Sequence, residues 1–182
     1  MLNFPVTTVY CDSLESVGYS FQYVDAQLQA QQYIPMEDQG PENRIFAQYH
    51  KGYTDKMKNL IISELQKENP KLRLVFATVA LGMGFNSPSA CRIIHFRPPT
   101  TLERYLQAGR SGQEAHALVY YNNSDVASNR KGLKLEVKQY VKNTTSCLRK
   151  HLVSYFGFSE IMYNGPPEKC CSNCRNQSQI NV

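Results

Sequence analysis

Four of the six cysteines gather in the last 36 residues, and two of them have the spacing of metal ligands. Cys171 and Cys174 form a C-x-x-C pair, which is the usual knuckle of a structural zinc site. The N-terminus lacks a charged segment followed by a long apolar run, so we expect no secretion signal. We therefore expect an intracellular, reducing location, where clustered cysteines bind metal more often than they form disulfides.

The ligand set of such a site stays open at Cys170. Adjacent residues such as Cys170 and Cys171 rarely face one ion unless the backbone turns sharply between them. His151, four residues after Cys147 on an expected helix, is the alternative ligand. A cluster of cysteines that binds no metal is the remaining alternative.

A second group of polar residues follows the expected strands. His50 and Lys51 come directly after residues 44–49, and Thr78 comes after residues 72–77. Parallel α/β sheets bind ligands beyond the carboxyl ends of their strands, so His50 and Lys51 are candidate phosphate contacts. A solvated turn at His50 and Lys51, and a Thr78 hydroxyl that binds its own backbone, are the plainer interpretations.

The elements that must position these residues alternate between strand and helix. Strands are expected at 6–11, 44–49, 72–77, 91–96 and 115–121, and helices at about 13–33, 54–69 and 101–107. Such alternation favours a parallel sheet covered by helices on both faces. From residue 124 onward we expect two helices and no strand, and therefore place domains at residues 1–123 and 124–182.

The bulk composition sets only wide limits on function. The 182 residues carry a formal net charge of +5 and a pI near 8.9, which suits a nucleic-acid partner without requiring one. No apolar run reaches the length of a transmembrane helix, so we expect no membrane association.

Several strings resemble motifs of RecQ-type DNA helicases. TTVYC at 7–11 looks like motif IV, FAQYHKGYT at 46–54 resembles the Tyr-His-x-Gly segment, and VFATVALGMGFN at 75–86 resembles motif V. SCLRKHLVSYFG at 146–157 is similar to the zinc-subdomain signature, and EKCCSNCR at 168–175 to the Werner-type zinc cluster. The resemblance covers residues 6 to 176. It implies an α/β fold, namely a parallel-sheet RecA-like helicase C-terminal lobe followed by a small helical zinc-binding subdomain.

The resemblance also implies roles for individual residues. In it, one Zn²⁺ is held by Cys147, Cys170, Cys171 and Cys174. Thr78 stands where the family contacts a nucleic-acid phosphate, and the partner is DNA, single-stranded or partly unwound.

The nucleotide-binding and catalytic candidates lie further along the sheet edge. ATP with Mg²⁺ is expected to approach Gly82, Gly84 and Asn86. A glycine pair permits close backbone approach or a positive φ, and Asn86 stands where the family often has Asp. Arg110 would stabilise charge on the γ-phosphate as an arginine finger, while Gln107 would orient water or phosphate.

Motif VI is shorter here than in the family. QAGRSG at 107–112 stands where the pattern Gln-Glu-x-Gly-Arg-Ala-Gly-Arg-Asp-Gly is expected. A four-residue deletion keeps both flanks in register and makes Arg110 the finger. A gapless alignment makes Arg110 the first motif arginine instead and puts Gln113 at the finger position. Either alignment removes one positive charge from a phosphate site.

The first motor lobe of the family has no counterpart in these 182 residues. They contain neither a G-x-x-x-x-G-K-[ST] phosphate loop nor an Asp-Glu-x-His segment. One hypothesis is the C-terminal motor half of an ATP-dependent 3′–5′ RecQ-like DNA helicase, a hydrolase and isomerase that is nuclear in a eukaryote. The other is a non-catalytic, zinc-stabilised nucleic-acid-binding remnant. In both, we expect this segment alone to hydrolyse no ATP.

Overall fold

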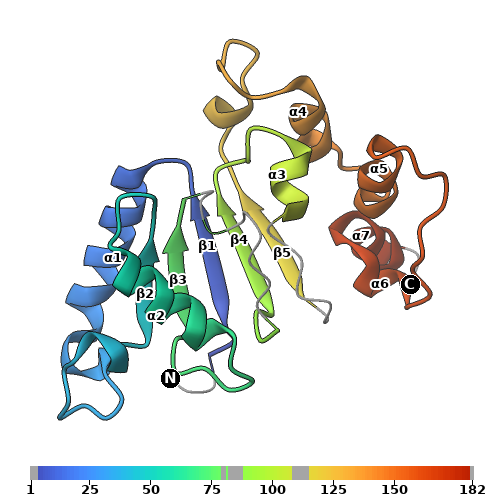
Figure 1. Ribbon diagram of the computed structural model, residues 1–182. Coiled ribbons are helices and arrows are strands. Elements are labelled where there is room, and N and C mark those ends of the chain that lie inside the picture. Colours follow the sequence, from blue (N-terminus) through green and yellow to red (C-terminus); the bar gives the residue numbers. More distant parts are fainter. Residues whose placement is uncertain (1–3, 79–80, 82–87, 108–114, 181–182) are drawn as a thin grey trace. The chain divides into compact units, whose positions relative to one another are not determined.

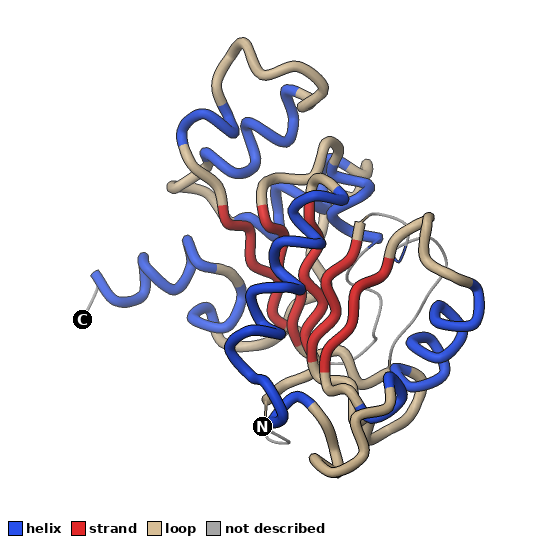
Figure 2. The backbone as a smooth tube through the Cα atoms, turned by 90° about the vertical axis from the view of Figure 1, so that its left-hand side faces the viewer, coloured by secondary structure: helices blue, strands red, loops and turns tan. Residues whose placement is uncertain are grey.

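Five parallel strands form one sheet in this computed structural model, which describes residues 4–78, 81, 88–107 and 115–180 (Figures 1 and 2). Their order is β2-β3-β1-β4-β5, so β2 and β5 are the edge strands. The strands are β1 Thr7–Cys11, β2 Phe46–Tyr49, β3 Leu74–Ala77, β4 Arg92–Phe96 and β5 His116–Tyr120. The expected parallel α/β architecture is confirmed.

The sheet buries apolar side chains on both faces, as parallel sheets require. Along β3 the side chains alternate: Leu74 and Phe76 pack in one apolar cluster, Val75 and Ala77 in the other. Helix α1, Leu14–Leu28, covers the first cluster, and α2, Asp55–Leu65, covers the second.

Both covering helices begin at a side-chain cap. The Ser13 hydroxyl accepts a hydrogen bond from the Ser16 backbone N–H, and the Thr54 hydroxyl accepts one from Met57. These bonds satisfy donors that the first helical turn leaves free. The expected starts are therefore confirmed, whereas α1 ends at Leu28 and continues as a 3₁₀ turn, η1 (Gln29–Gln32). A second such turn, η2 (Pro41–Asn43), precedes β2.

The chain divides into two compact units. The first contains residues 1–99 and 103–130, and the second contains residues 100–102 and 131–182. Helix α3, Leu102–Gln107, precedes β5, and the 3₁₀ turn η4, Asn123–Val126, follows it.

The second unit contains helices and loops but no strand over the residues that the structure describes. Its helices are α4 Leu135–Lys142, α5 Leu148–Tyr155, α6 Pro167–Cys170 and α7 Ser172–Ile180. The expectation of two helices is thus wrong in number, because α6 and α7 form in addition to α4 and α5. Pro167, the first residue of α6, has no N–H to leave unpaired, and its fixed φ favours that helix. Nowhere among the described residues is a helix long and apolar enough to span a bilayer.

Candidate metal centre and sheet-edge site

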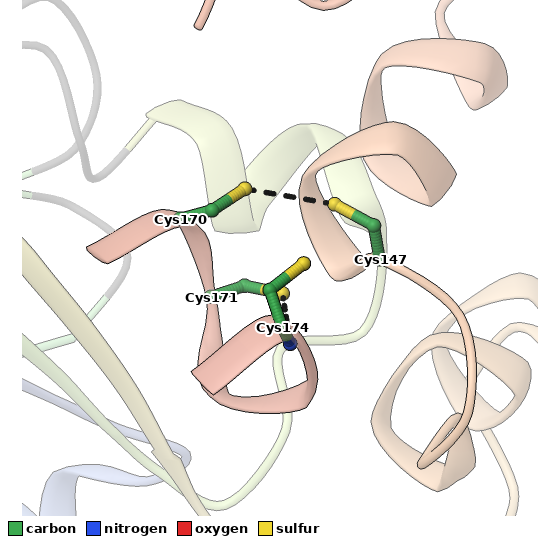
Figure 3. Close-up of side chains that lie close together, drawn as sticks. All are labelled: Cys147, Cys170, Cys171 and Cys174. Carbon is green, nitrogen blue, oxygen red and sulfur yellow. Dashed lines mark hydrogen bonds between the residues drawn. The ribbon is translucent and has the colours of Figure 1, made fainter. Parts of the chain in front are cut away.

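The four C-terminal cysteines converge within the second unit, as Figure 3 shows. Their sulfur atoms all lie within 4.8 Å of one another, and the Cys147 and Cys170 sulfurs are 3.7 Å apart. All four are free thiols and partly buried. Four sulfurs about 2.3 Å from one tetrahedral Zn²⁺ would be about 3.8 Å from each other. The cluster therefore fits a zinc ion closely.

Local backbone conformation allows the neighbours Cys170 and Cys171 to share the cluster. Helix α6 ends at Cys170 and α7 begins at Ser172, so Cys171 stands between them in extended conformation, with φ −160° and ψ 172°. This break between two helices allows the adjacent pair to face one cluster. Cys147 occupies the N-cap of α5, one residue before the helix in which the sequence had placed it.

Backbone N–H groups point at the sulfur atoms of the cluster. Leu148 and Cys174 donate to the Cys171 sulfur at 3.4 Å and 3.5 Å, and Lys150 donates to the Cys147 sulfur at 3.5 Å. Such donors stabilise thiolates, the form that binds metal.

The pKa values of the clustered cysteines are shifted in opposite directions. Burial raises the pKa of Cys171, but the N–H donors from Cys174 and Leu148 outweigh it and bring that pKa down to about 7. Burial raises the pKa of Cys174 to about 12, helped by its hydrogen bonds with Cys171 and Cys147. Burial and the nearby Cys147 also raise the pKa of Cys170. A divalent cation removes this conflict because it stabilises all four thiolates together.

Asn173 is a supporting residue that the sequence analysis missed. Its buried side-chain amide donates to the backbone oxygens of Asn143 and Ser146, at 2.9 Å and 2.8 Å. These bonds tie α7 to the turn before α5, and so tie Cys174 to Cys147. The sequence feature that could have identified it is its position between the two cysteines of the C-S-N-C string.

His151, the alternative ligand, lies outside the cluster of four sulfurs. Its Nδ1 is 3.5 Å from the Asn143 side-chain nitrogen, and its ring meets Tyr140 edge-on at 5.7 Å between centroids. This packing gives the ring a structural position, in which it joins α5 to α4 and to Asn143.

In the first unit, the candidate phosphate contacts meet at the carboxyl edge of the sheet. Tyr49 and Ala77 are register partners, and the Thr78 N–H donates to the Tyr49 carbonyl oxygen at 3.1 Å. His50 and Thr78, the next residues of their two strands, are therefore neighbours. Lys51 is exposed beside them, and His50 stacks at an angle on Tyr53 at 5.2 Å.

An ion-pair network at the same edge was not predicted. Arg97 follows β4 and Asp12 follows β1, and the two pair at 3.0 Å. Arg97 has a φ of 79° and also reaches buried Asp125 at 3.5 Å, which in turn holds Arg130 at 2.8 Å. Asp125 is 3 % exposed, so two arginines compensate its buried charge.

His95 lies beneath this edge as a buried, neutral imidazole. It stacks with Tyr10 at 5.4 Å and contacts Tyr105 of α3 at 5.2 Å. Burial lowers its pKa to about 4. The ring therefore packs α3, which ends at Gln107, against the sheet.

Sequence comparison assigns both parts of the chain. The family model described as "Helicase conserved C-terminal domain" matches residues 7–113, and the one described as "RecQ zinc-binding" matches residues 104–176. The chain belongs to the helicase conserved C-terminal domain family. Its four-cysteine cluster falls inside the RecQ zinc-binding match.

Similar proteins confirm the RecQ resemblance of this helicase C-terminal lobe. The helicase SGS1 of Saccharomyces cerevisiae is 30% identical over 155 residues, covering 74% of this chain and 10% of its own length. The RecQ-like helicase BLM of Xenopus laevis is 29% identical, and the match covers 69% of this chain and 11% of BLM. Pasteurella multocida RecQ is 28% identical, covering 69% and 21%. The chain thus spans a tenth to about a fifth of these relatives.

Solved structures share the fold at low identity. The DUF1998 helicase MrfA, solved bound to DNA, superposes with a TM-score of 0.55 at 20% identity and covers 87% of this chain and 19% of its own. Yeast Dbp5, solved with RNA and ADP BeF3, gives a TM-score of 0.52 at 10% identity and covers 68% and 30%. These likenesses support the helicase lobe fold alone.

Part of the expected nucleotide site falls outside the described residues. Gly82, Gly84, Asn86 and Arg110 are among those positions, as is Gln113 of the gapless alignment. Gln107 is described only as the last residue of α3. Their roles remain predictions.

Proposed function

We propose that this chain is the C-terminal motor lobe and zinc module of an ATP-dependent 3′–5′ RecQ-like DNA helicase. The observation that carries the proposal is the succession of a helicase C-terminal sheet and a four-sulfur cluster that fits zinc, each within its family match. Cys147, Cys170, Cys171 and Cys174 would hold Zn²⁺, which stabilises the fold of the second unit without taking part in chemistry. We also propose that the boundary between the two domains lies near residue 123.

The charge distribution supports DNA as the partner. The second unit contains eight lysines and arginines against three glutamates, a formal net charge of +5, which equals that of the whole chain. The first unit is therefore formally neutral. Positive charge concentrated in one small unit attracts the phosphate backbone with little dependence on base sequence.

The sheet edge would supply further phosphate contacts. Lys51 is exposed there, and His50 and Thr78 lie side by side at the ends of β2 and β3. ATP with Mg²⁺ would need a first lobe to cradle its phosphates. Arg110 and Gln107 of this lobe would then act on the γ-phosphate, and Gly82, Gly84 and Asn86 would line the nucleotide.

Salt-dependent binding to single-stranded DNA tests the contact model. The probe is a fluorescent oligothymidylate of about 20 nucleotides. For single strands, each phosphate contact contributes about −0.7 to the slope of log K against log salt. The double variant Lys134→Gln, Lys142→Gln should flatten that slope by about 1.4, whereas Lys56→Gln on α2 should leave it unchanged. A slope near zero for the native chain would contradict the model.

A non-catalytic remnant is the second candidate, and the shortened motif VI favours it. Adding a RecQ-type first lobe to the chain distinguishes the two candidate functions. DNA-stimulated ATP turnover that Arg110→Ala abolishes supports the motor half. DNA binding without turnover supports the remnant. The chain by itself should hydrolyse no ATP, because it contains no phosphate loop.

A further inference from the structure

A small pocket lies at the free edge of β2, within the first unit. Both Phe46 and Ala47 line it. Consecutive residues of a strand point to opposite faces of the sheet, so a pocket that both residues line must open at the strand's edge. β2 is the terminal strand of the sheet, which Figure 1 shows.

The pocket walls are mainly apolar and the space matches one side chain. Phe21 of α1 lines one side, and Met57 and Leu60 of α2 line the other. The volume is about 60 Å³. On this scale one water needs about 10–15 Å³, so the pocket takes roughly four to six non-hydrogen atoms. That is the size of one aliphatic side chain.

The backbone at this edge offers hydrogen-bonding groups to an added strand. Leu74 donates to the Ile45 carbonyl oxygen, and Thr78 donates to that of Tyr49, so these residues face β3. By the two-residue period of a strand, the backbone groups of Phe46 and Gln48 point away from β3. No described strand pairs with them on that side. An exposed edge of this kind is a template for an extended peptide.

The pocket carries one uncompensated charge among the described residues, and that charge is negative. Arg44 lies 5.2 Å and 5.5 Å from the ring centres of Phe21 and Phe46, and it pairs with Asp25 at 3.5 Å. Glu42 on the pocket wall is exposed, and its carboxylate bonds to no residue within the described ranges. An occupant with a cationic side chain near Glu42 would be complementary.

We propose that this edge pocket docks an extended segment of a partner protein. The segment adds to β2 as a further strand, inserts one aliphatic side chain between α1 and α2, and sets a neighbouring lysine or arginine beside Glu42. Because β2 has only four residues, the docked segment is short. This function is separate from zinc and nucleic-acid binding.

Binding of a designed peptide to the full chain tests the proposal. The probe is fluorescein-labelled, amidated Thr-Lys-Leu-Arg-Val-Thr, and its acidic counterpart is Thr-Glu-Leu-Glu-Val-Thr. The basic probe should bind saturably and more tightly. Glu42→Lys should weaken it about fivefold and improve the acidic probe. Glu68→Lys, an exposed glutamate outside the pocket lining, should change neither affinity.

A proline variant tests strand addition specifically. The Gln48 N–H points to the open edge, so Gln48→Pro removes that donor while the pairing with β3 remains. It should weaken the basic probe about fivefold, whereas Gln48→Ala should not. Should the proline variant fail to fold, amide exchange in the native chain replaces it: the probe should slow exchange at Phe46 and Gln48.

Three outcomes would overturn the proposal. One is equal binding of the basic and acidic probes. Another is the absence of saturable binding and of protection at Phe46 and Gln48. The third is a chain that does not bind the probe but forms a concentration-dependent dimer, which Gln48→Pro abolishes. The occupant of the edge would then be a second copy of this chain.

Discussion

The Asn173 side-chain amide donates to the Asn143 backbone carbonyl at 2.9 Å, across 30 residues of sequence. The same amide nitrogen donates to the Ser146 carbonyl, and its residue is only 6 % exposed. Asn143 in turn accepts hydrogen bonds from the backbone N–H groups of Thr145 and Ser146. Two asparagines therefore fix the turn that presents Cys147 to the α6–α7 cysteines, independently of any metal.

Replacing Asn173 should weaken the metal centre without touching a ligand. In Asn173→Ala, the carbonyls of Asn143 and Ser146 lose two part-buried hydrogen bonds, which contribute about 0.5–1.5 kcal/mol each. Outer-shell losses of this kind typically reduce metal affinity 10–100-fold. Competition with a chromogenic chelator measures the zinc affinity. Asn176→Ala, on an exposed position of α7, is the matched control and should keep native affinity.

Removing Cys174 should release zinc and loosen the second unit alone. Small metal-bound modules draw much of their folding free energy from the ion, and this unit has few buried apolar residues, among them Val137 and Tyr140. Zinc content and amide hydrogen exchange measure the effect. In Cys174→Ala, helices α5 and α7 should exchange fast while the β1 and β3 amides stay protected. Loss of protection throughout the sheet would contradict this.

The fold was largely predictable because its signals are local. Each strand appeared as a short apolar run, and Thr54 marked the start of α2. The missed elements depend on contacts that periodicity does not encode. Helix α6 and the 3₁₀ turn η1 have only four residues each, so neither repeats an apolar pattern long enough to detect.

The metal centre was predicted as a set of residues but not as a geometry. Spacing identified Cys171 and Cys174, whereas the place of Cys170 depends on the extended backbone of Cys171 between two helices. Arg97 and Asp12 lie 85 residues apart, and only the pairing of β1 with β4 brings them together. From the sequence, His95 was only one residue of an expected strand. The structure places it between Tyr10 and Tyr105.

The choice between Cys170 and His151 as the fourth ligand is testable by paired variants. Cys170→Ala should lower zinc affinity strongly, because its sulfur lies 3.7 Å from that of Cys147. His151→Ala should keep one zinc per chain, since its ring packs on Tyr140. Zinc titration measures both. Stoichiometric zinc in Cys170→Ala together with its loss in His151→Ala would make His151 the ligand.

The stability of the first unit should fall with acid because of His95. Burial lowers the pKa of His95 from 6.5 to about 4, so the unfolded chain binds a proton that the folded chain excludes between these values. The contribution of His95 to the free energy of unfolding is therefore complete above pH 6.5. It declines as the pH falls toward 4, at up to about 1.4 kcal/mol per pH unit. Urea unfolding, followed through the methyl signals of Ile93, reports on the sheet rather than the zinc centre.

His95→Gln removes the titrating group from this position and should flatten that pH dependence between about pH 5 and 6.5. Its absolute stability falls as well if Gln packs poorly between Tyr10 and Tyr105, so the slope with pH, and not the stability at one pH, is the informative quantity. His116→Gln is the control, because His116 is exposed on β5 and should leave the slope of the native chain unchanged. An equal slope in the native chain and in His95→Gln would mean that His95 is protonated alike in the folded and unfolded chain. The buried, neutral state assigned to this imidazole would then be wrong.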